Sequence, residues 1–238
     1  MNITFTNVKD FSIEEYLPVP AKKLTPDWYK KANSYIGDKK FPEENGSTTA
    51  TIKRCMPVFD AMTAGYIIPT YIDIFVSQKE QIDNEGNLKV MPWYNWGSFN
   101  PIEFHPTQQA PTHPGYNGSP FAKWMSPWSI KTSKGYSCLF VPPMHHENKY
   151  FSVLPAIVDT DVYTAPVNFP FILNDLSFEG LIPAGTPLVQ IIPFKRDEWN
   201  MNFGNVEDVI NSNKATFKLK SIFYDGYKNK FRQEKLYN

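Results

Sequence analysis

The chain has 238 residues, with 24 basic and 24 acidic side chains and a formal net charge of zero. This length allows one large domain with a well-buried core, and the balanced charge argues against a protein that mainly coats nucleic acid. Aromatic residues make up 16% of the chain and prolines number 21. That composition favours short strands joined by ordered, proline-bearing loops over a helical bundle.

The first fifty residues predict an N-terminal approach segment that leads into the core. A strand is expected over residues 3–5. Thr25 and Pro26 form a helix start, with threonine as the cap and proline at the first helical position. This short helix should end by Gly37 and lead into a polar loop. Residues 51–62 are ambiguous between a strand and a single helical turn.

Alternating apolar and polar residues predict a β-rich core domain over residues 51–204. Residues 83–87 have the composition of a hairpin turn. Residues 94–120 are expected to form a long, irregular but ordered loop, and the wider stretch 91–128 offers an aromatic surface of the kind used in protein contacts. The expected strands span residues 65–69, 72–76, 88–93, 123–125, 128–132, 136–141, 157–161, 167–173 and 188–193.

The last segment, residues 205–238, changes character. Its apolar residues recur at approximately helical spacing, with lysine and arginine between them. We expect one or two helices that form a C-terminal tail packed on the core. The predicted organisation is therefore an approach segment over 1–50, a core over 51–204 and a tail over 205–238.

The two cysteines, Cys55 and Cys138, lie in apolar stretches and have no C-x-x-C partner. We expect free, buried thiols, with a disulfide as the less favoured alternative, and this points to a reducing compartment. We expect no secretory leader, because residues 1–5 lack a basic region followed by an apolar one, and no apolar run reaches the ~18 residues of a membrane span. The expected location is the cytoplasm, with no membrane partner.

The four histidines could in principle bind a metal ion. His145 and Glu147 have the His-x-Glu spacing of a two-histidine, one-carboxylate iron site, but no distal histidine follows. His105 and His113 each precede a proline, which favours extended loops. We interpret all four as loop residues and predict no metal site. The sequence also lacks a nucleophile elbow, a phosphate loop and a zinc-deaminase motif, so we predict no cofactor.

One acidic pair could carry chemistry. Asp159 and Asp161 are two residues apart in a predicted strand, so their carboxylates should face the same side. Two carboxylates placed together raise one pKa, which can make a general base. The alternative is structural: an aspartate at the end of a strand caps the following turn.

Residues 121–140 resemble a family of uncharacterised proteins that many tailed phages and some bacteria encode. Residues 157–161 and 185–196 are similar to that family's other signatures. The resemblance covers most of residues 51–199. It implies a phage source, and hence a host cytoplasm, but it implies no particular reaction.

The order of motifs also resembles the trimeric dUTPase and dCTP deaminase superfamily. Residues 64–66 are similar to its opening Ala-Gly-Tyr, and residues 132–136 to the turn before its central strand. Residues 156–163 are similar to its aspartate motif, with Asp159 at the place of the water-activating carboxylate. Asn174 and residues 182–190 resemble its late asparagine and its final motif strand.

This second resemblance implies a mainly β, β-clip or dUTPase-like fold and a homo-oligomer. The superfamily's Arg-Ser-Gly phosphate-binding element has no counterpart, because residues 142–144 are Pro-Pro-Met. Carboxylates without phosphate-holding groups cannot support triphosphate hydrolysis. The first hypothesis is therefore a non-enzymatic protein that binds a partner protein or its own copies.

The second hypothesis is a nucleotide-binding enzyme of the dUTPase type. Under this hypothesis the resemblance implies Asp159 or Asp161 as general base and Mg²⁺ as a possible cofactor. The ligand-binding residues would then be Tyr66, Tyr163 and Gln190. Whether the chain is an enzyme stays open at this point.

Overall fold

The computed structural model describes residues 1–9, 15–37, 49–82, 86–96, 101–106, 109, 113–114, 121–221 and 226–238. These residues form two compact units, each assembled from two stretches of the chain. The β unit comprises Met1–Leu24 and Gly65–Arg196, and the helical unit comprises Thr25–Ala64 and Asp197–Asn238. These boundaries differ from the three consecutive segments expected from the sequence.

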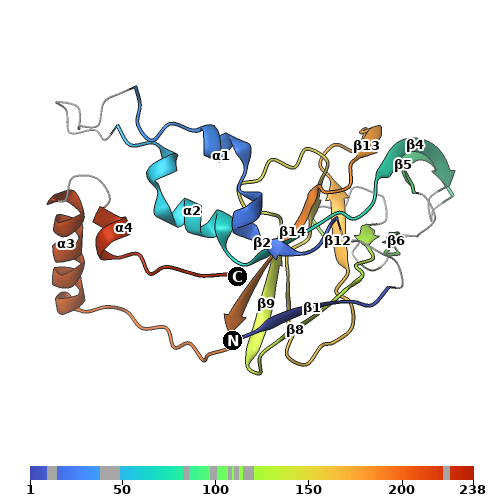
Figure 1. Cartoon of the computed structure of the whole chain (residues 1–238). Coiled ribbons are helices and arrows are strands. Elements are labelled where there is room, and N and C mark those ends of the chain that lie inside the picture. Colours follow the sequence, from blue (N-terminus) through green and yellow to red (C-terminus); the bar gives the residue numbers. More distant parts are fainter. Residues whose placement is uncertain are drawn as a thin grey trace. The chain divides into compact units, whose positions relative to one another are not determined.

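The prediction of a mainly β protein is confirmed, because the described residues form several antiparallel sheets and few helices (Figure 1). The sheets of the β unit have five, four, three and two strands, and every strand pairing between described residues is antiparallel. One short 3-10 helix, η1, spans Ala21–Leu24. The strands are β1 (Ile3–Asn7), β2 (Val19–Pro20), β3 (Tyr66–Pro69), β4 (Ile74–Ile82), β5 (Leu88–Asn95), β6 (Ile102–Phe104), β7 (Ala122–Trp124), β8 (Trp128–Thr132), β9 (Tyr136–Val141), β10 (Phe151–Val153), β11 (Ala156–Val158), β12 (Phe169–Leu173), β13 (Gly180–Ile182) and β14 (Pro187–Lys195).

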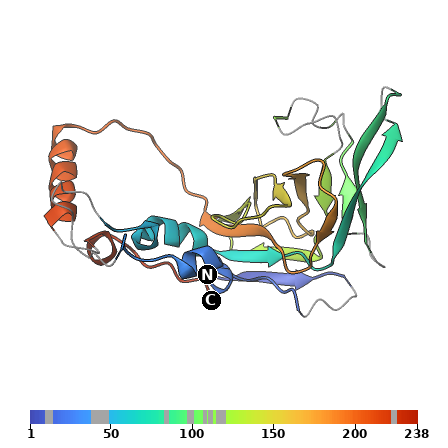
Figure 2. The ribbon, with the colours of Figure 1, turned by 90° about the horizontal axis from the view of Figure 1, so that it is seen from above.

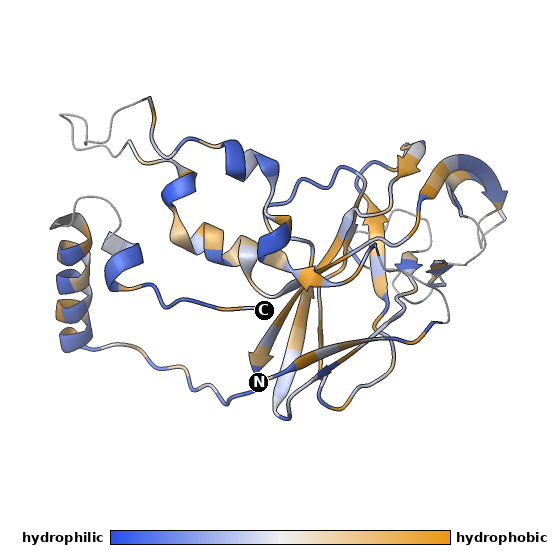
Figure 3. Cartoon of the chain, in the orientation of Figure 1, coloured by the Kyte–Doolittle hydropathy of each residue, from blue (hydrophilic) through white to orange (hydrophobic). Residues whose placement is uncertain are grey.

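The five-stranded sheet has the order β11-β9-β14-β3-β2. It contains β11, which comes directly before Asp159, and β14, which contains much of the last segment that resembles the dUTPase superfamily. β14 is the middle strand, paired with β9 on one side and β3 on the other. Side chains of β8 and β12 alternate between buried and more exposed positions, as period-two strands over a core require. The largest fully buried side chains include Trp124, Phe140, Phe151 and Phe171. In Figure 3, β12 and β14 are correspondingly rich in hydrophobic residues.

The hairpin of β4 and β5 is longer than the sequence predicts. β4 continues past Val76 to Ile82, and its pairing with β5 runs from Phe75–Asn95 to Ile82–Leu88. Figure 2 shows the two strands as one long twisted ribbon. The predicted turn lies largely outside the described residues, as does much of the predicted loop 94–120. That loop nevertheless contains strand β6, which pairs with β7.

Gly65 stands immediately before β3 and has a positive φ of 65°. A Cβ atom at this position would overlap the backbone carbonyl of Ile191 in the neighbouring strand. The Gly65 carbonyl also accepts a hydrogen bond from Ala21 N at 2.9 Å. Only glycine suits this combination of backbone conformation and close approach.

The helical unit contains α1 (Asp27–Lys31), α2 (Met56–Thr63), α3 (Val206–Ser221), α4 (Gly226–Lys230) and the 3-10 helix η2 (Ile52–Arg54). The predicted N-terminal helix and terminal helices are confirmed. Pro26, however, is the N-cap of α1 rather than its first helical residue. The ambiguous stretch 51–62 contains η2 and most of α2, and Pro57 lies in the first turn of α2, where a proline is compatible with a helix.

One ionic cluster joins the two stretches of the helical unit. Asp60 of α2 accepts hydrogen bonds from Arg232 Nη2 at 2.7 Å and from Lys235 Nζ at 3.0 Å. The Asp60 and Arg232 side chains are both largely buried. Neither cysteine is in a disulfide, as predicted, and Cys138 is buried; Cys55 is exposed, so the prediction of burial is wrong for it.

Candidate functional site

Asp159 and Asp161 lie in a turn and not on a strand face as predicted. Strand β11 ends at Val158, and the Asp159 carbonyl accepts hydrogen bonds from the backbone N–H groups of Val162 and Tyr163, at 3.1 and 2.9 Å. The chain turns here because these hydrogen bonds replace the pairing with β9. The two carboxylates still lie close together. The turn and a shared third residue hold them in place, instead of a common strand face.

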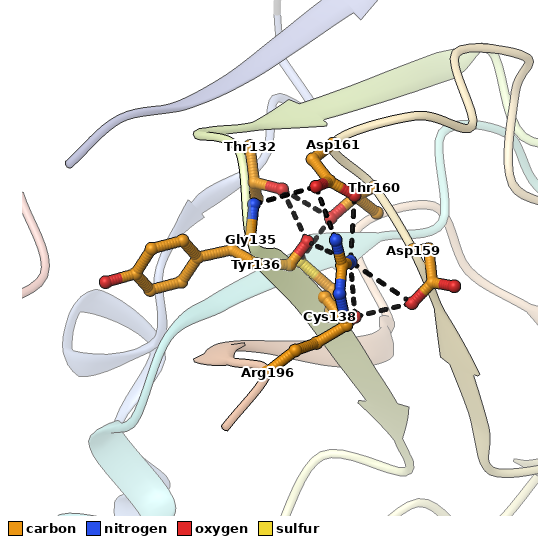
Figure 4. A network of polar contacts seen from close by, with 9 residues as sticks. Thr132, Gly135, Tyr136, Cys138, Asp159, Thr160, Asp161 and Arg196 are labelled. Atoms are coloured by element: carbon orange, nitrogen blue, oxygen red, sulfur yellow. Dashed lines mark hydrogen bonds and ion pairs between the residues drawn. The ribbon is translucent and has the colours of Figure 1, made fainter. Parts of the chain in front are cut away.

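That third residue is Arg196, which directly follows β14 and which the sequence did not single out. Its Nη1 donates to Asp161 Oδ1 at 2.8 Å and to Asp159 Oδ1 at 3.3 Å, and its Nη2 donates to Asp161 Oδ2 at 2.5 Å. Nη1 also lies 3.0 Å from the Tyr136 carbonyl and from Ser137 Oγ. Figure 4 shows the guanidinium in the centre of this network.

Strand β9 and the turn before it complete the network. Gly135 N donates to Asp161 Oδ2 at 2.8 Å, and Ser137 Oγ donates to Asp159 Oδ1 at 2.6 Å. Beneath them, the buried Thr160 hydroxyl lies 2.8 Å from the Thr132 hydroxyl and 3.3 Å from Cys138 Sγ. The acidic turn is therefore fixed to β8, β9 and the end of β14 at once.

The electrostatics of this site differ between the two aspartates. Hydrogen bonds from Arg196 and from the Gly135 amide lower the pKa of Asp161 from 3.8 to about 2. The Asp161 side chain is only 4% exposed, and both of its oxygens are occupied. Asp161 is thus ionised but poorly placed to accept another proton. Asp159 is 59% exposed, and its second oxygen points away from the network in Figure 4.

The predicted ligand-binding residues have separate surroundings. Tyr66, in β3, makes an edge contact with the Phe5 ring at 5.5 Å. Gln190, in the middle of β14, is fully buried, and its Oε1 accepts a hydrogen bond from Met144 N at 2.8 Å. Tyr163 is exposed, and its hydroxyl lies 3.5 Å from the Pro166 carbonyl. None of these side-chain contacts involves the two carboxylates, although the Tyr163 backbone N–H donates to the Asp159 carbonyl.

The side-chain contacts of His105 and His113 do not involve the aspartate pair either. His105 Nδ1 is 2.6 Å from Gln109 Oε1, and the ring of His113 contacts the ring of Phe121 edge-on at 5.2 Å. His145 has a left-handed backbone, with φ of 62°. Within the described ranges, no three His, Cys, Asp or Glu side chains cluster as a metal ion would require.

A cavity of about 280 Å³ is the feature that the sequence did not predict. It lies in the β unit, between the β4–β5 hairpin and the sheet that contains β6, β7 and β12. The aromatic composition of residues 91–128 was a signal for it, but the lining also comes from β4 and β12. The lining residues are Gln81, Met91, Pro92, Trp93, Tyr94, Phe104, Phe121, Ala122, Phe171, Ile172, Leu173 and Leu176.

No protein-family model matches the chain, and no curated protein matches it either. Among the helices that the structure describes, none combines the length and the apolar character needed to cross a membrane.

Proposed function

We propose that this chain is a phage-type, non-enzymatic protein that works by binding, and that its first partner is a second copy of itself. The observation that carries the proposal is the surface of residues 199–219. In this stretch of the helical unit, large apolar side chains are exposed instead of buried. Exposed apolar residues at this density mark interaction surfaces. They are Trp199, Met201, Phe203, Val206, Val209, Ile210, Phe217 and Leu219.

The charge pattern of α3 favours a second copy as the occupant. The first turn of the helix carries Glu207 and Asp208, and its later turns carry Lys214 and Lys218. Figure 3 shows hydrophilic and hydrophobic residues interleaved along this helix. Two copies of α3 packed antiparallel would place each acidic turn beside the partner's basic turns while the apolar side chains meet.

The mass of the full-length protein in solution, measured by light scattering, tests the proposal. We expect an oligomer for the natural chain and a lower mass for Ile210→Asp, because the substitution places a charge in the apolar contact. Asn211→Asp, on the adjacent exposed position of the same helix, is the control and should keep the oligomer. A monomeric natural chain, or two variants with the same mass as the natural chain, would contradict the proposal.

A β-clip or dUTPase-like arrangement is the finer fold that we propose. Its support is that the resembling segments converge in one sheet. Tyr66 and Ile191 are paired across β3 and β14, and β11, which precedes the acidic turn, pairs with β9 beside β14. A trimeric mass in the same scattering experiment would favour this assembly and would contradict the antiparallel pair of α3 helices, which makes a dimer.

A nucleotide-binding enzyme with an aspartate base is the alternative. The exposed second oxygen of Asp159 favours it, whereas the occupied oxygens of Asp161 disfavour that residue as the base. A rise in melting temperature with dUTP or dCTP and Mg²⁺, abolished by Asp159→Asn, would support the enzyme and count against a purely binding role.

A further inference from the structure

The cavity of the β unit has walls suited to a flat apolar molecule. Five of its lining residues are aromatic, and none of the lining residues carries a charge. Ligand sites in proteins are typically concave and apolar, with a few polar groups that fix orientation. A charged ligand would lose its hydration here without gaining an ionic partner among the lining residues.

The aromatic walls are held in place by their neighbours. The ring of Tyr94 lies 5.9 Å from that of Phe104 and 5.8 Å from that of Phe171, the second at an interplanar angle of 83°. Phe171 in turn contacts the rings of Trp124 and Phe151 in the core. Rings fixed in this way present defined faces and edges to a further ring.

Gln81 and Tyr94 are two lining residues that carry uncharged polar groups able to donate a hydrogen bond. Among the described residues, neither the Gln81 side-chain amide nor the Tyr94 hydroxyl has a hydrogen-bond partner. Burial raises the pKa of Tyr94, so its hydroxyl stays protonated and can donate. Together they offer a donor and an acceptor to a ligand that carries one ring N–H or one carbonyl.

The size and the access of the cavity set the limits of the ligand. Its volume of about 280 Å³ exceeds the ~150 Å³ of an apolar cavity that holds benzene. Trp93, Phe104 and Leu176 in the lining are each more than a third exposed, so the cavity opens to solvent. Trp93 itself is steadied by a hydrogen bond from its Nε1 to Asn95 Oδ1 at 3.1 Å.

We infer that this cavity binds an uncharged aromatic compound of one or two fused rings, oriented by Gln81 and Tyr94. The site lies in the β unit and is built from strands β4, β5, β6, β7 and β12 and the residues next to them. It is therefore independent of the exposed stretch 199–219 through which we propose self-association.

Titration of the full-length protein with indole, followed by ligand-observed NMR, tests this inference. Saturable binding of indole is expected, with binding of indole-3-acetate weaker by at least about tenfold, because its carboxylate has no partner in the cavity. Leu176→Trp should fill the mouth of the cavity and weaken indole binding at least about tenfold. Leu181→Trp is the matched control, since Leu181 is similarly exposed but does not line the cavity.

Indole that does not bind saturably, or that binds the natural chain and Leu176→Trp equally, overturns the inference. Equal loss of binding in both tryptophan variants overturns it as well, because the effect would not be specific to the cavity. Gln81→Leu tests whether Gln81 orients the ligand. The substitution should weaken the binding of indole more than that of naphthalene, which has no N–H to donate.

Discussion

The β unit and the helical unit use apolar side chains in opposite ways. In the β unit, large aromatic residues from distant strands pack into one buried cluster. In the helical unit, Tyr29 and Met62 are the buried large apolar residues among those described, while residues 199–219 expose theirs. The first arrangement stabilises a fold, and the second leaves apolar area exposed, which is the area we propose for self-association.

The ionic contacts of the two units also differ in the parts of the chain that they join. In the β unit, Arg196 binds Asp159 and Asp161 beside strands β9 and β14, whose apolar side chains are part of the buried core. In the helical unit, Asp60 joins α2 to the last residues of the chain through its hydrogen bonds with Arg232 and Lys235. Burial alone would raise the pKa of Asp60, but the hydrogen bonds from these two cations outweigh it and lower the pKa. The helical unit therefore depends more on charge than the β unit does.

The largest expected effect comes from emptying the core of the β unit. Trp124 is fully buried and contacts the rings of Tyr71, Phe151 and Phe171. Trp124→Ala should lower the free energy of unfolding by about 3–5 kcal/mol in a denaturant titration. Leu236→Ala, at a position of the helical unit that is 72% exposed and lies outside residues 199–219, should change it by less than about 0.5 kcal/mol. Similar losses for both variants would contradict the contrast between the units.

A smaller, local effect is expected from Asp60→Asn. This substitution removes the charge that Arg232 and Lys235 share, so α2 and residues 226–238 should lose hydrogen-exchange protection together. Protection of β9 and β14 should not change. Asp27→Asn is the control, because Asp27 pairs with Lys30 on the exposed surface, where ion pairs contribute little. Uniform loss of protection across both units would show that they unfold together.

The smallest expected effect is a dependence of stability on acid pH. The folded pKa of Asp161, about 2, is lower than the ordinary value of 3.8. Its contribution to stability is therefore complete above about pH 4 and is lost as the pH falls towards about 2. The difference in unfolding free energy between the natural chain and Asp161→Asn should shrink across this interval. A difference that stays constant would mean that Arg196 does not favour the ionised form.

The predictable part of the fold is the part with local signals. Strands β8 and β9 follow from alternation and from the turn at Gly135, and α3 follows from helical spacing. The extension of β4 beyond Val76 was missed because residues 77–81 are mostly polar. A two-stranded hairpin pairs its backbone without burying a continuous apolar face, so no alternation marks it.

Only part of the candidate site could be predicted, because local sequence patterns do not report which distant strands pair. The proximity of Asp159 and Asp161 is visible in the sequence, but Arg196 reaches them only because β14 pairs with β9. No local pattern encodes that pairing. The cavity was harder still, since its lining is distributed from Gln81 to Leu176 and no local pattern groups these residues.

The glycine before β3 limits how this chain can vary. A side chain at position 65 would meet the Ile191 carbonyl, so the close approach of β3 and β14 forbids every other residue type there. The exposed positions of α3 carry no such restriction. In a library of random variants sorted for folding, position 65 should therefore stay fixed while residues 206–219 drift. The same contrast would distinguish true structural relatives of this chain from sequences that share only its composition.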